Sequence, residues 1–154
     1  MNLTQLQTLK AALLADSALA ADVAALNIGA IVNYLNAESA FIVWRTKVQA
    51  QQVMEDAFIW TDVDALSISK ARTWEWLTRY GTFNPSKSTV RQGLSDCFGA
   101  GSAMATAVTP HLKRPATRGE KVFATGTGTT GSPGLLVFEG NVATYDVVQA
   151  LTQI

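Results

Sequence analysis

Apolar residues recur at helical spacing near the start of the chain. Leu6, Leu9 and Leu13 follow one another every three or four residues, which places them on one face of a helix. Thr4 and Gln7 stand ahead of them in the spacing of a capping box, in which two side chains satisfy the first backbone amides. The pattern predicts a helix over residues 5–15.

The same kind of pattern continues along most of the sequence. The most regular stretch begins at Ser67, has apolar residues at every third position up to Tyr80, and ends at Gly81. Capping residues and apolar stripes predict further short helices over residues 18–26, 27–35, 46–57, 86–98, 102–113, 117–123 and 144–151. The best strand candidate is Phe41–Trp44, which is rich in β-branched and aromatic residues, and Leu135–Phe138 is a second one.

Residues 126–134 differ from the rest, because four of these nine residues are glycine. Such a segment predicts a flexible connector. The expected fold is therefore mainly α: a bundle of several short helices with a small β-hairpin or strand element and a flexible C-terminal arm. We expect a helical domain over 1–125, a Gly/Thr-rich linker over 126–134 and an arm over 135–154, whose apolar residues are buried against its own domain or against a neighbour.

The composition narrows the possible functions. Charged residues make up only 16% of the chain, and 12 basic side chains balance 12 acidic ones. A surface poor in charge is typical of a protein that contacts other subunits, although an alanine-rich protein has the same composition. The balance of charge lacks the basic excess of most nucleic-acid binders. Neither a signal peptide nor an apolar run long enough to span a membrane is present, so we expect assembly in the cytoplasm.

No combination of residues predicts catalysis, a cofactor or a metal site. His111 is the only histidine and has no cysteine at zinc-ligand spacing, so an ordinary polar role is favoured. Cys97 lies on an apolar helical stripe, which is typical of a buried thiol rather than a nucleophile. Four carboxylates are close in sequence, and a metal or acid–base pair there remains the less favoured alternative to helix capping: Glu55, Asp56, Asp62 and Asp64.

Two other features have competing interpretations. The glycines of 126–134 are not followed by the lysine of a phosphate-binding loop, so we reject that function for them. Basic residues gather in the second half among aromatic ones, which fits either a solvated helix face or a strip for nucleic acid, the former being favoured. They are Arg72, Arg79, Lys87, Arg91, Lys113, Arg114, Arg118 and Lys121.

Tryptophan is frequent, with four in 154 residues. Trp74 and Trp76 are two positions apart and cannot share a helix face, so one of them is expected to meet a neighbouring element or a partner. The side chains that we expect at an interface combine tryptophans with apolar residues of the C-terminal arm. They are Trp44, Trp74, Trp76, Leu135, Leu136, Phe138, Tyr145, Val148 and Leu151.

Several short segments resemble a family of virion structural proteins of tailed bacteriophages. They span roughly residues 40–140 and comprise Val43–Thr46, Trp60–Thr61, Lys70–Arg72, Trp74–Trp76, Asn84–Lys87, Val90–Arg91, Gly93, Arg114–Thr117, Glu120–Lys121 and Phe123–Gly128. Helical phage proteins of this size with an arm are similar to head–tail adaptors. That resemblance implies a non-enzymatic protein that forms a homo-oligomeric ring, typically of twelve copies, between portal and tail.

The resemblance also implies the partners of such a protein. They are copies of itself, the portal protein and tail proteins, with non-specific contact to packaged double-stranded DNA possible and no membrane. Its location would be the virion, after assembly in the host cytoplasm. Two alternatives stay open: another head or tail component, such as a decoration or minor tail protein, and a small nucleic-acid-associated protein that uses the basic second half.

Overall fold

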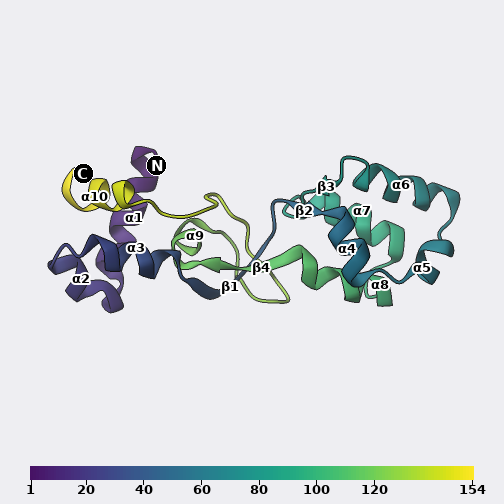
Figure 1. Cartoon of the computed structure of the whole chain (residues 1–154), viewed down its shortest axis with the longest axis horizontal. Helices are drawn as coiled ribbons and strands as arrows, with labels where there is room; N and C mark the ends of the chain where they lie inside the picture. The colour runs from purple at the N-terminus through teal and green to yellow at the C-terminus, as the bar shows by residue number, and fades with distance from the viewer. The chain divides into compact units, whose positions relative to one another are not determined.

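The computed structural model describes residues 1–154 and confirms a mainly α fold. Ten α-helices, two 3-10 helices and two small two-stranded sheets make up the chain (Figure 1). In chain order the elements are α1 (Leu3–Ala15), η1 (Ser17–Leu19), α2 (Ala20–Ala24), α3 (Ile28–Asn36), β1 (Glu38–Trp44), β2 (Val48–Gln49), α4 (Ala50–Ala57), α5 (Trp60–Asp64), α6 (Ile68–Thr78), β3 (Thr82–Phe83), α7 (Ser88–Phe98), α8 (Ala103–Val108), η2 (Thr109–Leu112), β4 (Lys113–Thr117), α9 (Arg118–Phe123) and α10 (Thr144–Thr152).

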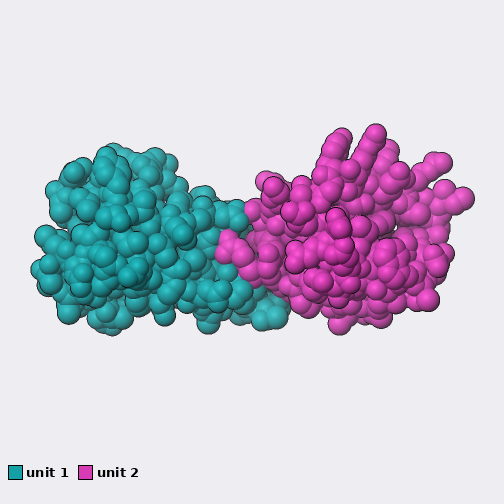
Figure 2. Space-filling view, viewed as in Figure 1, with its two compact units in different colours: residues 1–43, 115–154 teal, residues 44–114 magenta.

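The chain divides into two units. Unit 1 comprises Met1–Val43 and Pro115–Ile154, and unit 2 comprises Trp44–Arg114 (Figure 2). This division differs from the predicted domain over 1–125 with a linker and an arm. The reason is a long-range pairing: β1 and β4 form one sheet, so the chain leaves unit 1 and returns to it on neighbouring strands.

The core of unit 1 lies among α1, α3, α9 and α10. Leu9, Leu13, Ile31 and Val147 are fully or almost fully buried there. Burial of one such side chain contributes roughly 1.5–3 kcal/mol, so these helices are held together mainly by their apolar faces.

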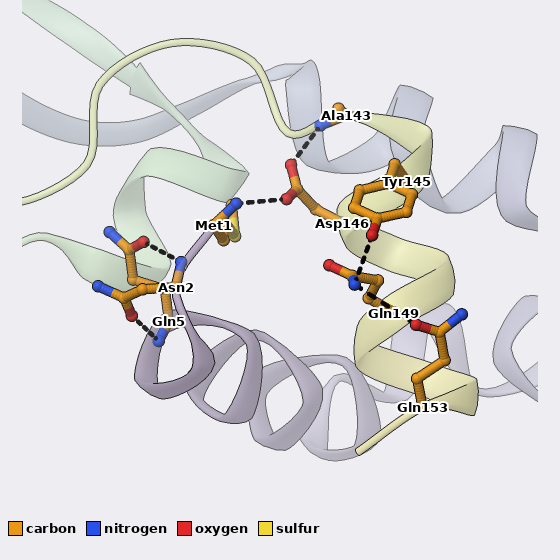
Figure 3. Close-up of polar contacts among 8 residues, drawn as sticks. All are labelled: Met1, Asn2, Gln5, Ala143, Tyr145, Asp146, Gln149 and Gln153. Carbon is orange, nitrogen blue, oxygen red and sulfur yellow. Dashed lines mark hydrogen bonds and ion pairs between the residues drawn. The ribbon is translucent and has the colours of Figure 1, made fainter.

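Polar contacts attach the C-terminal segment to the same unit. The Asn36 amide donates to Val142 O at 3.0 Å and accepts from Val142 N at 2.8 Å. Near the start of α10, the Asp146 carboxylate accepts from the Met1 ammonium at 2.8 Å and from Ala143 N at 3.2 Å (Figure 3). The predicted arm was expected to be buried either against its own domain or against a neighbour. Its helix α10 packs on α1 and α3 of the same chain.

The glycine-rich segment 126–134 is hydrogen-bonded rather than a bare connector. Gly128 O accepts from Ile42 N at 2.7 Å, and Gly134 N donates to Ile42 O at 2.8 Å. Thr125 and Leu135 exchange two backbone hydrogen bonds of 2.9 Å, which close the base of the loop. The glycines therefore allow the backbone to approach Phe41 of β1, which no larger residue would permit.

Unit 2 is built from α4 to α8 around a second core. Val53 and Met104 are almost fully buried in it, and β2 pairs with β3 in antiparallel register, Val48 opposite Phe83. Arg91 holds the turn before α7, because its guanidinium donates to Pro85 O at 2.7 Å and to Ser86 O at 2.9 Å.

Candidate functional site

The residues with catalytic potential do not gather in one place. His111 Nδ1 lies 4.0 Å from Asp56 Oδ2, and both side chains are partly exposed. No group of three or more His, Cys, Asp or Glu side chains is arranged to hold a metal ion. The pair is thus a single solvent-screened contact, of the kind that contributes little to stability.

Cys97 is buried in α7, with 2% of its surface exposed. Burial raises the pKa of its thiol, and Asp96 adds to this effect, while Lys70 acts in the opposite direction. The thiol donates to Lys70 O at 3.5 Å. A buried thiol with a raised pKa is a poor nucleophile, because the thiolate is the reactive form.

Two of the four tryptophans belong to the packing of unit 2. The Trp74 ring is buried between Phe58, with centroids 4.9 Å apart, and Phe98, at 5.6 Å. Trp44 is half-buried beneath two cations, Arg91 at 4.7 Å and Lys113 at 5.0 Å from its ring centroid. Burial lowers the pKa of Lys113. Trp74 therefore belongs to the core rather than to an exposed contact.

A cavity of about 270 Å³ adjoins these rings in unit 2, lined mainly by apolar side chains, including Trp74, Phe98 and Met104. Unit 1 has a more polar pocket of about 430 Å³, with Asp16, Tyr34 and Arg118 on its wall. There the Tyr34 hydroxyl donates to Asp16 Oδ2 at 2.9 Å, and the Arg118 guanidinium stacks 4.3 Å from the Tyr34 ring centroid. In this pocket the polar groups of Asp16, Tyr34 and Arg118 therefore interact with one another.

The C-terminal residues predicted at an interface are only partly available. Phe138 packs against Phe123, with centroids 5.3 Å apart, and Leu151 packs on the core of unit 1. Leu136 and Val148 are half-buried, whereas Leu135 and Tyr145 are exposed. The segment 135–138 is not a strand; only Leu135 forms an isolated bridge, to Thr125.

The most exposed large apolar side chains of unit 2 lie on or next to α6. Trp76 is 74% exposed, Ile68 76% and Tyr80 84%, whereas Trp74 of the same helix is 8% exposed. The two tryptophans thus lie on opposite sides of α6, as their spacing predicts. The exposure of Ile68 and Tyr80 was not predicted, since both were placed in the apolar stripe of this helix.

Charge is distributed unevenly between the two units. Unit 1 has six acidic and three basic side chains, a formal net charge of −3, whereas unit 2 has six acidic and nine basic ones, a net charge of +3. The neutral total of the sequence conceals this difference, because it emerges only when residues 1–43 are grouped with 115–154. The two units therefore carry formal net charges of opposite sign, and two of the acidic side chains of unit 1, Glu120 and Asp146, are buried.

Comparison with known proteins identifies no relative. No family model, no curated protein and no solved structure matches the chain. None of its helices combines the length and the apolar character that crossing a membrane requires.

Proposed function

We propose that this chain is a structural protein of a tailed-bacteriophage virion, a head–tail adaptor whose copies form a ring between the portal and the tail. The observation that carries the proposal is the division of charge, −3 in unit 1 and +3 in unit 2. The resemblance of residues 40–140 to phage virion proteins is the reason for assigning the protein to a phage particle.

A ring requires that each copy offers two different, complementary surfaces to its neighbours. Oppositely charged units supply such a pair within one chain, and complementary charge guides association and suppresses wrong pairings. The zero net charge of the whole chain also means that like copies do not repel one another at long range. Exposed apolar side chains on both units, such as Leu14 in unit 1 and Trp76 in unit 2, provide surface that association can bury.

The C-terminal segment has no part in this proposal. Its helix α10 buries Val147 and Ala150 within unit 1, so the apolar face that would reach a neighbour is already covered. Assembly is assigned instead to surfaces that the folded units expose.

Deletion of the coding sequence from a phage genome that carries it tests the proposal directly. We expect filled heads without tails in electron micrographs, and recovery of tailed particles when the protein is supplied in trans. Complete, infectious particles formed without the protein would contradict the proposal. Labelled protein on the head surface or along the tail would instead assign it to the decoration or minor tail proteins.

The positive charge of unit 2 favours one alternative, a nucleic-acid-associated protein. Binding of this kind weakens steeply with salt, because it releases the counterions of the phosphates. Retention of the purified chain on DNA at low salt, lost at high salt, would support the alternative. Failure to bind DNA at low salt would remove it, and with it the contact with packaged DNA.

A further inference from the structure

The exposed face of α6 combines apolar and basic side chains. Ile68, Arg72, Trp76, Arg79 and Tyr80 form this face and are called the α6 stripe below; all five are exposed. A tryptophan that leaves three-quarters of its surface in water forgoes most of the free energy that its burial would provide. Surfaces of this composition are typical of binding sites, where Trp, Tyr and Arg contribute most of the affinity.

Helix geometry places these residues together. Ile68, Arg72 and Trp76 are four residues apart, a spacing that keeps side chains on one face of an α-helix, and Arg79 lies one turn beyond Trp76. Trp74 points to the opposite side, into the core of unit 2. The stripe is thus attached to the unit through Trp74, which fixes the direction in which Trp76 projects.

The basic residues of the stripe have no acidic partner within the chain. The ion pairs of the structure do not include Arg72 or Arg79, and neither guanidinium donates a hydrogen bond. Ile68 and Trp76 add exposed apolar area, which a phosphate backbone cannot bury, so a protein surface fits the stripe better than a nucleic acid does.

We propose that the α6 stripe is the anchor of the contact between copies: it docks on the negatively charged unit 1 of a second copy of this chain. This inference rests on the proposed self-assembly and assigns it to particular residues. Trp76 supplies buried apolar area at the centre of the contact, while Arg72 and Arg79 meet the acidic partner surface. Four acidic side chains of unit 1 are partly or fully exposed, namely Asp16, Asp22, Glu38 and Glu139, and the unit also exposes Leu14 and Leu26.

The test compares self-association of full-length variants by sedimentation and mass photometry. We expect Trp76→Ala to weaken association about thirtyfold, the effect typical of a central interface residue. The double reversal Arg72→Glu/Arg79→Glu should weaken it at least as much. Its matched control is Lys47→Glu/Lys87→Glu, which changes the charge of unit 2 equally at two exposed positions outside the stripe. Circular dichroism confirms that each variant is folded.

A mixing experiment distinguishes head-to-tail docking from other arrangements. Labelled Trp76→Ala protein should bind unlabelled wild-type protein, because its unit 1 is intact, although its binding to itself is weakened. Stripe variants that associate like the wild type would overturn the inference but not the proposed self-assembly, and so would a control reversal that weakens association as much as the stripe reversal does. If Trp76→Ala protein bound neither itself nor the wild type, the contact would be stripe to stripe, which would also overturn the inference. DNA binding that the stripe reversal abolishes would overturn it as well. Wild-type protein that stays monomeric would instead refute the proposed self-assembly.

Discussion

Substitution of Gly128 by alanine tests how the glycine-rich segment is held in unit 1. Gly128 has a φ of +67°, in the left-handed region, and its carbonyl accepts the hydrogen bond from Ile42 N. A Cβ at this position would lie 2.1 Å from Cδ2 and 2.2 Å from Cε2 of Phe41. Carbon atoms in contact are about 3.5–4 Å apart, so the ring and the loop cannot both keep their positions.

The expected cost follows from two contributions. The left-handed conformation costs alanine about 1–2 kcal/mol, and forcing an additional methyl group into a packed site costs about 1–3 kcal/mol. Alanine also restricts the unfolded chain, which offsets about 0.4–1 kcal/mol of this cost. We therefore expect Gly128→Ala to lower the free energy of unfolding by about 1–5 kcal/mol.

The matched control is Gly131→Ala in the same segment. A Cβ at Gly131 meets nothing within 4 Å, and its φ is not positive, so this substitution should be neutral or slightly stabilising. Urea unfolding followed by circular dichroism gives the stabilities, and amide exchange of residues 125–135 locates the change. Tryptophan fluorescence is unsuitable, because all four tryptophans lie in unit 2. Equal stability of the two variants would refute the packing of Phe41 against this loop.

Three further predictions concern single side chains. Cys97 should react with a thiol reagent on the order of a hundredfold more slowly in the folded protein than in urea, and rapid labelling of the native chain would show that the thiol is accessible. The hydrogen bond to Asp16 and, after it, burial raise the pKa of Tyr34 above its ordinary value of 10.0. Asp16→Asn should therefore shift the titration of one tyrosine to lower pH in an absorbance experiment, and an unchanged titration would contradict that hydrogen bond. Leu26 has a φ of 51° at the end of α2, a position that favours glycine, so Leu26→Gly should raise the free energy of unfolding by about 0.5–1 kcal/mol, and a loss of stability in urea would mean that its side chain packs in the fold.

Local signals in the sequence predict several elements well. The capping box of Thr117 and Glu120 correctly marks the start of α9, with Thr117 Oγ1 accepting from Glu120 N at 3.1 Å. The helix predicted from Ser67 corresponds to α6, and Ser67 caps it. A cap satisfies backbone amides within one turn and needs no information from distant residues. The capping box predicted at Thr4 and Gln7 is wrong, because Asn2 and Gln5 form it and α1 begins at Leu3.

The exposed face of α6 shows where periodicity misleads. Apolar residues at every third position turn by 300° per step, so a run from Ile68 to Tyr80 winds around the helix instead of following one face. Only the middle of that run faces the core, which leaves both ends in water. Counting apolar residues at a spacing of three therefore overestimates the buried face of the helix. It also misses the exposed face, whose residues Ile68, Arg72 and Trp76 are four apart.

The two-unit organisation depends on contacts that no local pattern contains. Strand β4, with the sequence Lys-Arg-Pro-Ala-Thr, has one β-branched residue and no aromatic one, too weak a signal to indicate a strand, and it pairs with β1. The glycine-rich segment was predicted as a linker because its composition is also that of flexible chains. In the structure, Gly128 and Gly134 instead let the backbone of this segment lie against the Phe41 ring, where a Cβ would clash.

Cross-linking between isotopically distinct copies tests most directly whether the units of different molecules meet. An equal mixture of ¹⁴N- and ¹⁵N-labelled protein, treated with a lysine-specific reagent, shows which peptides are joined across copies. We predict mixed-isotope links from Lys70 on α6 to Lys10 or Lys121 in unit 1. Links joining Lys70 to Lys70, or only links within single molecules at concentrations where the protein is assembled, would contradict it.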